Sequence, residues 1–94
     1  MRICQVPLKV AKASIDGAFA NQGEVCCAPT RLLVQDNIKN ALLDKMIEYA
    51  SLIHPADPLN PQTEMGAIVS EDQLKTILHY IAQGNAEGAT MILN

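Results

Sequence analysis

Residues 31–55 read RLLVQDNIKNALLDKMIEYASLIHP, and this stretch indicates the fold class. Its first five residues, 31–35, form a short apolar run bounded by turn-forming residues, which favours a strand buried on both faces. The residues after it predict a helix over 37–53, capped by Asp36 or Asn37. The apolar stripe of this helix, at spacings of three and four, contains Ile38, Leu42, Met46, Tyr49 and Ile53.

On the N-terminal side, apolar residues at helical spacing predict a helix over about 8–22 that Asn21-Gln22-Gly23 stops. Gly17 weakens this helix by about 1 kcal/mol relative to alanine. The apolar stripe of this helix contains Leu8, Ala11, Ile15, Ala18 and Phe19.

On the C-terminal side, the helix over 37–53 should end at Pro55, because the residue before a proline avoids the α region. Residues 54–63 hold three prolines and are expected to form a stiff, extended connector, and the whole of 54–69 is expected to be irregular. Ser70 and Gln73 then match a capping box, which predicts a helix over 71–84. Its expected buried stripe contains Leu74, Ile77, Leu78 and Ile81, its C-cap is Gly84 or Gly88, and a second strand is expected over 89–93.

The predicted order is helix, strand, helix, connector, helix, strand. Strands that alternate with helices indicate an α/β architecture, with helices that flank a parallel or mixed sheet. Two strands alone do not make a stable sheet. We therefore expect residues 1–94 to be a single partial domain of a larger α/β protein.

Composition excludes several classes of function. The net charge is −3, the pI is about 5.1, and the seven Lys and Arg residues are scattered, which argues against a nucleic-acid partner. No apolar run approaches the ~18 residues that span a membrane, and we see no signal peptide, so a cytoplasmic location is expected. Three cysteines, two of them adjacent, fit reduced thiols and predict neither a disulfide framework nor a metal site.

Cys26 is the residue with the clearest potential for chemistry. Most free cysteines are inert packing residues, but Cys26 follows a polar, glycine-bearing turn between a helix and a strand, where a side chain can be exposed. Cys27 would point the other way in alternating geometry, and the adjacent pair could instead be a redox sensor. Neither His54 nor His79 has a catalytic or metal-ligating partner at a recognisable sequence spacing, so both are expected to be solvated or satisfied structural residues. The carboxylates read as helix caps and solvated faces are Asp36, Asp44, Glu48, Glu71 and Asp72.

Residues 19–31, FANQGEVCCAPTR, resemble the cysteine active-site signature of the aldehyde dehydrogenase family. In that signature an apolar or aromatic residue precedes a glycine, which is followed by Gln or Glu, one further residue and the nucleophilic cysteine. Gly23, Glu24 and Cys26 fill those places. Pro29 stands where glycine is commoner.

The resemblance continues to residue 94. Residues 57–70, DPLNPQTEMGAIVS, are similar to a recurrent family segment, in a style close to the enzymes that act on betaine aldehyde and aminoaldehydes. Residues 85–89, NAEGA, resemble the exit of the following family helix. The resemblance starts at about Ala13, and only the first twelve residues match poorly.

The resemblance implies a partial catalytic domain that oxidises a small-molecule aldehyde to a carboxylic acid with NAD or NADP. By analogy Cys26 is the nucleophile that forms the thiohemiacetal and the thioester, and its backbone N–H is one oxyanion donor. Cys27 and Cys4 are then bystanders, and Glu24 is a signature residue rather than the general base. Family members are usually homodimers or homotetramers.

The cofactor-binding domain of that family is not present in residues 1–94, which contain no glycine-rich phosphate loop. The chain alone is therefore expected to bind no NAD or NADP and to be inactive without the rest of the enzyme. The alternative is a non-catalytic, truncated α/β remnant or an interaction module.

Overall fold

A computed structural model describes residues 6–93 of the chain. The described part contains three α-helices, α1 (Val6–Phe19), α2 (Asp36–Ala50) and α3 (Glu71–Ala86), and a short 3-10 turn, η2 (Ala20–Gly23). These elements confirm the three predicted helices. In this part of the chain no helix has the length and apolar character that crossing a bilayer requires. Cys4 lies outside the described residues.

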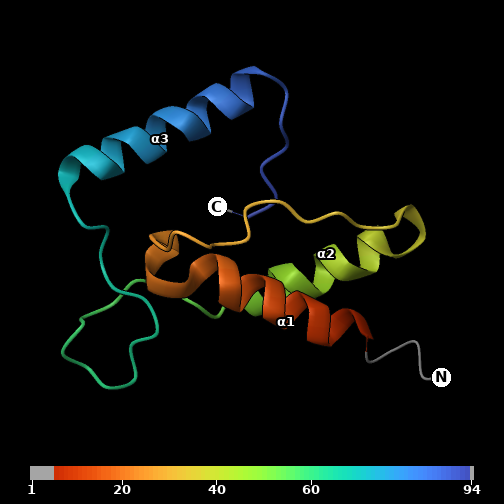
Figure 1. The fold of residues 1–94 in the computed structure, drawn as a ribbon, viewed down its shortest axis with the longest axis horizontal. Coiled ribbons are helices and arrows are strands. Elements are labelled where there is room, and N and C mark those ends of the chain that lie inside the picture. Colours follow the sequence, from red (N-terminus) through yellow and green to blue (C-terminus); the bar gives the residue numbers. More distant parts are fainter. Residues whose placement is uncertain (1–5, 94) are drawn as a thin grey trace.

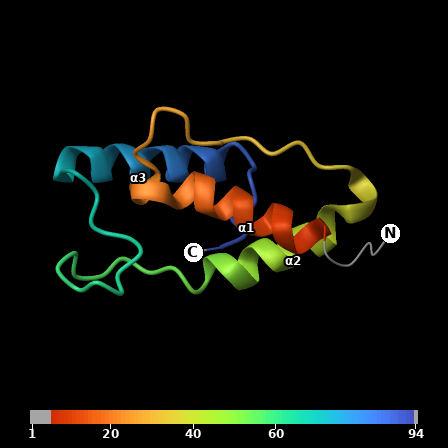
Figure 2. The same ribbon diagram turned by 60° about the horizontal axis from the view of Figure 1, so that its bottom comes forward.

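Helices α1 and α2 pack against each other and run in the same direction (Figures 1 and 2). Residues 24–35 return along the pair as an extended segment and deliver the chain to the start of α2 (Figure 1). Two parallel helices joined by an extended return segment are typical of α/β folds. The small core between them consists of Ala11, Ile15, Leu42 and Ala50, which are 0–5% exposed and belong to or extend the predicted stripes.

The two predicted strands are not formed. Residues 31–35 and 89–93 have no regular secondary structure, and the isolated bridge between Pro55 and Met65 is the only β pairing in the described part of the chain. An extended segment becomes a strand only when a neighbour accepts and donates its backbone hydrogen bonds. No described segment pairs its backbone with residues 31–35, and the Leu33 side chain is 99% exposed.

Both ends of α2 differ from expectation. The cap residue is Gln35, with extended backbone angles and no side-chain cap bond, while Asp36 lies inside the first turn. A carboxylate there still interacts favourably with the helix dipole. The helix ends at Ala50, well before Pro55, and i to i+3 hydrogen bonds then tighten the chain through Ile53. The proline is therefore not what ends this helix.

The connector is irregular as predicted, but it is a closed loop and not an extended spacer. The Ala56 N–H donates to the Met65 carbonyl at 3.0 Å, which brings the two ends of the loop together. Inside the loop, Asp57 accepts from the Leu59 N–H at 2.9 Å and its carbonyl accepts from Thr63 Oγ1 at 2.7 Å. Loops whose ends meet and whose own side chains hold them are compact and well defined.

Both ends of α3 follow the sequence signals. Ser70 Oγ accepts from the Gln73 N–H at 3.1 Å, which confirms the Ser70 half of the capping box. At the other end Gly88 adopts φ +93°, and the N–H groups of Gly88 and Ala89 donate to Asn85 and Gly84 at 3.2 and 2.9 Å. This is the Schellman pattern, so Gly88 is the left-handed cap.

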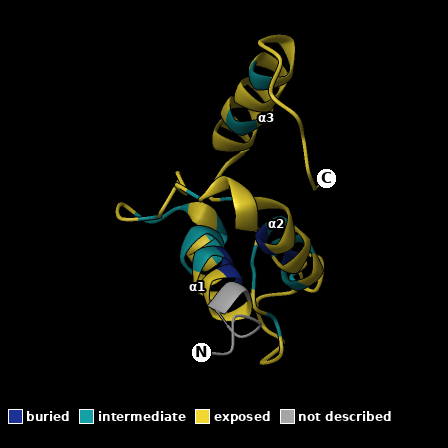
Figure 3. Ribbon diagram, turned by 90° about the vertical axis from the view of Figure 1, so that its right-hand side faces the viewer, coloured by how far each residue is buried: buried dark blue, intermediate teal, exposed yellow. Residues whose placement is uncertain are grey.

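The stripe of α3, however, is exposed and not buried. Leu74, Leu78 and Ile81 are 42%, 56% and 45% exposed, and α3 makes no contact with the other helices of the described chain. Figure 3 shows this helix standing apart from the α1–α2 pair. The total accessible surface is 7727 Å², against about 5,300 Å² for a compact monomer of this mass. The apolar stripe therefore has no partner within residues 6–93.

Candidate functional site

The predicted nucleophile lies in a tight turn. The Ala28 N–H donates to the Val25 carbonyl at 3.1 Å, so Cys26 and Cys27 occupy the two central positions. Both side chains are exposed free thiols. The alternating strand geometry assumed for Cys26 and Cys27 is not formed, because these residues lie in a turn. Exposure alone does not distinguish which of the two thiols is the nucleophile.

A left-handed segment precedes the turn. Asn21, Gln22 and Gly23 have φ values of 49°, 60° and 78° in succession. Glycine adopts this conformation freely, whereas a residue such as glutamine is disfavoured there by about 1–2 kcal/mol. The Asn21 side chain donates to the Glu24 carbonyl at 3.2 Å and the Glu24 N–H donates to the Asn21 carbonyl at 3.0 Å. These local bonds reverse the chain at the end of α1.

Two side chains attach this segment to the distant connector. Gln22 Oε1 accepts from the Gly66 N–H at 3.2 Å in a partly buried position. Glu24 Oε1 accepts from the Val69 N–H at 3.3 Å. Each bond joins residues more than forty positions apart, so the segment before Cys26 is held by tertiary contacts as well as by its own turn.

The residues after Cys26 approach α1 closely. A Cβ added at Gly17 would lie 2.9 Å from Pro29 Cγ and 3.3 Å from its Cδ. Glycine is thus required where the segment after the thiol crosses the helix. The turn is held from both sides, by Gln22 and Glu24 before it and by this packing after it.

Apart from the neighbouring thiol of Cys27, the surroundings of Cys26 offer no metal cluster among the described residues. Among residues 6–93 no three His, Cys, Asp or Glu side chains cluster as metal ligands would. His54 is exposed four residues after α2 ends, and His79 is exposed on α3, where its ring meets Tyr80 edge to face at 5.8 Å. Surface hollows of about 150–450 Å³ lie along the helices and the connector, and Cys26 lines none of those five. Within the described residues Cys26 is therefore an exposed thiol that belongs to no metal cluster.

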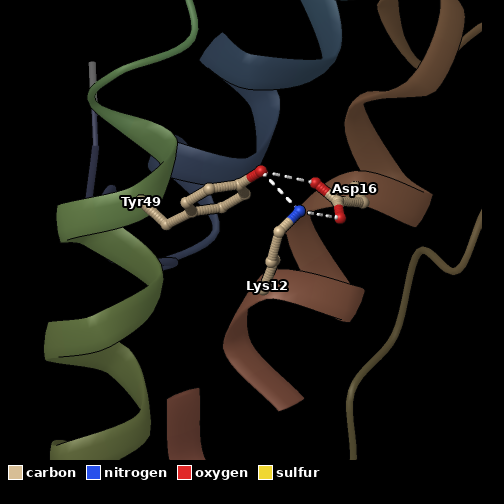
Figure 4. A network of polar contacts seen from close by, with 3 residues as sticks. All are labelled: Lys12, Asp16 and Tyr49. Atoms are coloured by element: carbon tan, nitrogen blue, oxygen red, sulfur yellow. Dashed lines mark hydrogen bonds and ion pairs between the residues drawn. The ribbon is translucent and has the colours of Figure 1, made fainter. Parts of the chain in front are cut away.

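A charged network joins α1 to α2 (Figure 4). Lys12 Nζ donates to Asp16 Oδ2 at 2.7 Å and to the Tyr49 hydroxyl at 2.9 Å, and that hydroxyl donates to Asp16 Oδ1 at 2.8 Å. The hydrogen bond from Lys12, then the one from Tyr49, lowers the pKa of Asp16, and the same contacts raise the pKa of Lys12. Every charge is compensated inside the network, so it fixes the helix pair and offers no free reactive group.

Sequence reasoning missed the roles of Gln22 and Lys12. Gln22 was noted only as part of the stop signal of the first helix, and Lys12 precedes the residues that carried the resemblance. The strain at Gln22, which persists only where surrounding contacts hold it, is visible only in the backbone angles of the structure. Nothing local identified Gly66 as its partner.

The family model for the "Aldehyde dehydrogenase family" matches residues 7–94, so the family match begins before Ala13, where the resemblance was expected to start. An aldehyde dehydrogenase of Vibrio cholerae is 47% identical over 75 residues, which is 80% of this chain and 15% of that relative. A betaine aldehyde dehydrogenase of Cereibacter sphaeroides is 40% identical over 80 residues, 85% of this chain and 17% of that relative.

The arrangement of the elements also has a solved counterpart. The crystal structure of an NAD-dependent aldehyde dehydrogenase from Sinorhizobium meliloti superposes with a TM-score of 0.86 at 31% identity, over 89% of this chain and 17% of that one. The chain thus spans about one sixth of the length of the proteins it matches. Because the superposition covers 89% of this chain, it includes the arrangement in which α3 stands apart from the other helices.

Proposed function

The chain belongs to the aldehyde dehydrogenase family, and from this membership we propose that it supplies the nucleophilic cysteine segment of an NAD(P)-dependent aldehyde dehydrogenase. The observation that carries the proposal is the position of Cys26, exposed at the centre of a turn and three residues after Gly23 of the signature. Its parent reaction is the oxidation of an aldehyde to a carboxylic acid.

Cys26 begins the reaction by addition. Its thiolate attacks the carbonyl carbon, a carbon–sulfur bond forms, and the carbonyl π electrons move to oxygen. The resulting oxyanion needs hydrogen-bond donors. Among the described residues the Cys26 N–H donates to no acceptor, so it is available for this purpose. An exposed thiol with a free N–H of its own suits the addition step.

The residues present do not form a dinucleotide site. The five glycines are dispersed, with Gly17 and Gly84 inside helices, Gly23 and Gly88 at caps and turns, and Gly66 in the connector. None of them makes the glycine-rich loop that cradles phosphates. The acceptor for hydride, NAD or NADP, therefore has to be held by other parts of the parent enzyme, and no step through it is assigned to these residues.

The surface of the chain favours action within a longer enzyme. Apolar side chains remain uncovered on α3 and on both segments expected as strands, and the surface exceeds the compact value by about 2,400 Å². Residues 31–35 and 89–93 supply extended segments that additional strands of the parent sheet would pair with. Without that remainder we expect no aldehyde oxidation, and a non-catalytic remnant or interaction module is the alternative.

The substrate proposal is limited to a small aldehyde. Betaine aldehyde and aminoaldehydes are the first to test, because a relative at 40% identity is a betaine aldehyde dehydrogenase and another at 38% is an aminoaldehyde dehydrogenase of Pisum sativum. The sequence of residues 57–70 also resembles that of the enzymes which act on these two substrates.

The deciding experiment places this segment in a complete enzyme. Residues 13–94 replace the matching segment of the Vibrio cholerae aldehyde dehydrogenase, and NADH production is measured for the parent hybrid, Cys26→Ala and Cys27→Ala. We expect Cys26→Ala to lose at least about 10³-fold in kcat, as removal of a covalent nucleophile does. Cys27→Ala is the matched control, because that thiol is also free and exposed. A dead Cys27→Ala beside an active Cys26→Ala would move the assignment by one residue.

A second arm uses the 94-residue chain alone. It should produce no NADH above a blank that lacks enzyme, with betaine aldehyde and either cofactor. Steady NADH production that Cys26→Ser abolishes would show that the chain binds the cofactor without the remaining enzyme and would contradict the proposal on that point.

A further inference from the structure

We propose that Gln22 and Glu24 are positioning residues, which dock the turn that carries Cys26 onto the connector through the N–H groups of Gly66 and Val69. This inference rests on the proposed role of Cys26, and neither residue touches the reacting atoms in it. Their function is to set where the thiol lies relative to the connector.

The first support is the geometry of the two bonds. The acceptors Gln22 Oε1 and Glu24 Oε1 lie two residues apart on one side of the turn, and the donors at Gly66 and Val69 lie three residues apart on the connector. Two bonds in parallel fix both the distance and the relative direction of the two segments, which a single bond does not. The Glu24 bond is also charge-assisted, since a carboxylate accepts from a backbone N–H.

The second support is the strain at Gln22. Its φ of 60° and ψ of 20° are unfavourable for a glutamine by about 1–2 kcal/mol. Asn21 and Gly23 tolerate that region more easily, so the conformation needs an external reason only at Gln22. A side chain held at both of its ends, by the left-handed backbone and by the Gly66 N–H, supplies that reason.

The third support is the closure of the connector. The bond from the Ala56 N–H to the Met65 carbonyl ends directly before Gly66, so the loop presents the Gly66 N–H from a fixed position. At Gly66 an added Cβ would lie 3.7 Å from Gln22 Oε1, which is ordinary contact. Glycine is therefore not needed there for space, and the contact with Gln22 consists of the backbone bond.

The catalytic consequence follows from position. A displacement of about 1 Å at a reacting group typically costs about 10²-fold in rate. Cys26 is only two residues from Glu24, so release of the docking displaces the thiol directly. The effect should appear in kcat and not in the binding of aldehyde.

The first test measures the contact itself, on the full 94-residue chain. Backbone amide hydrogen exchange is followed by NMR for the native chain, Gln22→Leu, Gln22→Glu and Gln83→Leu. Loss of the acceptor should speed exchange at Gly66 by about five- to tenfold, as the loss of one hydrogen bond does. Gln22→Glu keeps an acceptor oxygen and should retain protection. The control, Gln83, is an exposed glutamine on α3 whose change should leave Gly66 unaffected.

The second test measures the consequence, in the Vibrio cholerae hybrid that carries residues 13–94. We expect Gln22→Leu and Glu24→Leu each to lower kcat by about 10- to 100-fold, with KM for betaine aldehyde within about twofold. Glu24→Gln retains a carbonyl oxygen and should recover most of the lost kcat. Gln83→Leu should behave as the parent hybrid. A residue that only stabilised the fold would lower the amount of active enzyme, which titration of the Cys26 thiol measures, and kcat per titrated thiol would not change.

The outcomes separate this inference from the proposed function. Unchanged exchange at Gly66 in Gln22→Leu, or unchanged kcat per thiol in both leucine variants, overturns the docking role while Cys26→Ala still tests the nucleophile. If Gly66 exchanges faster in Gln22→Leu of the 94-residue chain but the hybrid stays active after Cys26→Ala, the contact is real and its catalytic role is overturned. Equal loss in Glu24→Gln and Glu24→Leu also contradicts the inference, because the carbonyl oxygen would then be irrelevant.

Discussion

Replacement of Gly17 by alanine tests the close approach of the Cys26 segment to α1. In the middle of a helix this change normally stabilises by about 0.8–1 kcal/mol, because alanine restricts the unfolded chain and favours the helix. Here the new Cβ would lie 2.9 Å from Pro29 Cγ. Favourable carbon–carbon contact begins near about 3.5 Å, so the overlap is about 0.6 Å against a rigid ring. Overpacking of this kind costs about 1–3 kcal/mol.

The sum predicts a change of sign. We expect Gly17→Ala to destabilise the α1–α2 pair by about 0–2 kcal/mol, although helix propensity alone predicts the opposite. Gly84→Ala in α3 is the matched control, since its new Cβ would lie 4.0 Å from Ala89 Cβ, in ordinary contact. That variant should stabilise its helix by about 1 kcal/mol.

The assay has to read the two helices separately, because α3 does not contact the α1–α2 pair in the described chain. Native-state amide exchange gives a local opening free energy for amides of α1 around Ile15 and for amides of α3. The double variant Gly17→Ala with Pro29→Ala completes the cycle, since alanine lacks the ring carbons that meet the new Cβ. A coupling of about 1 kcal/mol or more is expected. Stabilisation by Gly17→Ala with Pro29 intact would refute the reasoning.

The remaining predictions concern the charged network and the ends of α3. The pKa of Asp16 is lowered below its ordinary 3.8 by its contact with Lys12, so the stabilisation it gives is present above that pH and is lost as the pH falls through the folded value. The melting temperature of the native chain should therefore fall between about pH 6 and pH 2 more than that of Asp16→Asn, which lacks the carboxylate. An equal fall in the native chain and in Asp16→Asn would contradict this prediction. Ser70→Ala should destabilise the first turn of α3 by about 1 kcal/mol, seen as faster exchange at Gln73, whereas Ser70→Asp should restore the cap. Gly88→Ala should destabilise the last turn of α3 by about 1–2 kcal/mol. The cost comes from backbone strain alone, because φ is +93° and an added Cβ would meet no atom within 4 Å. A thermal melt followed by ellipticity at 222 nm that is the same for the native chain and for Gly88→Ala would count against it.

Several features of this protein were determined by the sequence alone. The helix positions followed from apolar spacing, and the start of α3 followed from Ser70, because capping is decided within one turn of the chain. The sequence left the C-cap open between Gly84 and Gly88, and the structure places Gly84 inside the helix and Gly88 at the cap. The family was evident from residues 19–31, since a signature is a local string. Each of these depends on interactions between residues a few positions apart.

Only the tertiary structure decided the rest. Leu74 and its neighbours on α3 have the spacing of a buried stripe, yet they are exposed, because burial depends on a partner that spacing does not specify. Residues 31–35 have the composition of a strand, yet they stay unpaired, because pairing needs a neighbour's backbone. The docking of Gln22 and Glu24 on Gly66 and Val69 joins residues more than forty positions apart. Such contacts form only when the whole chain is folded around them, so local pattern cannot indicate them.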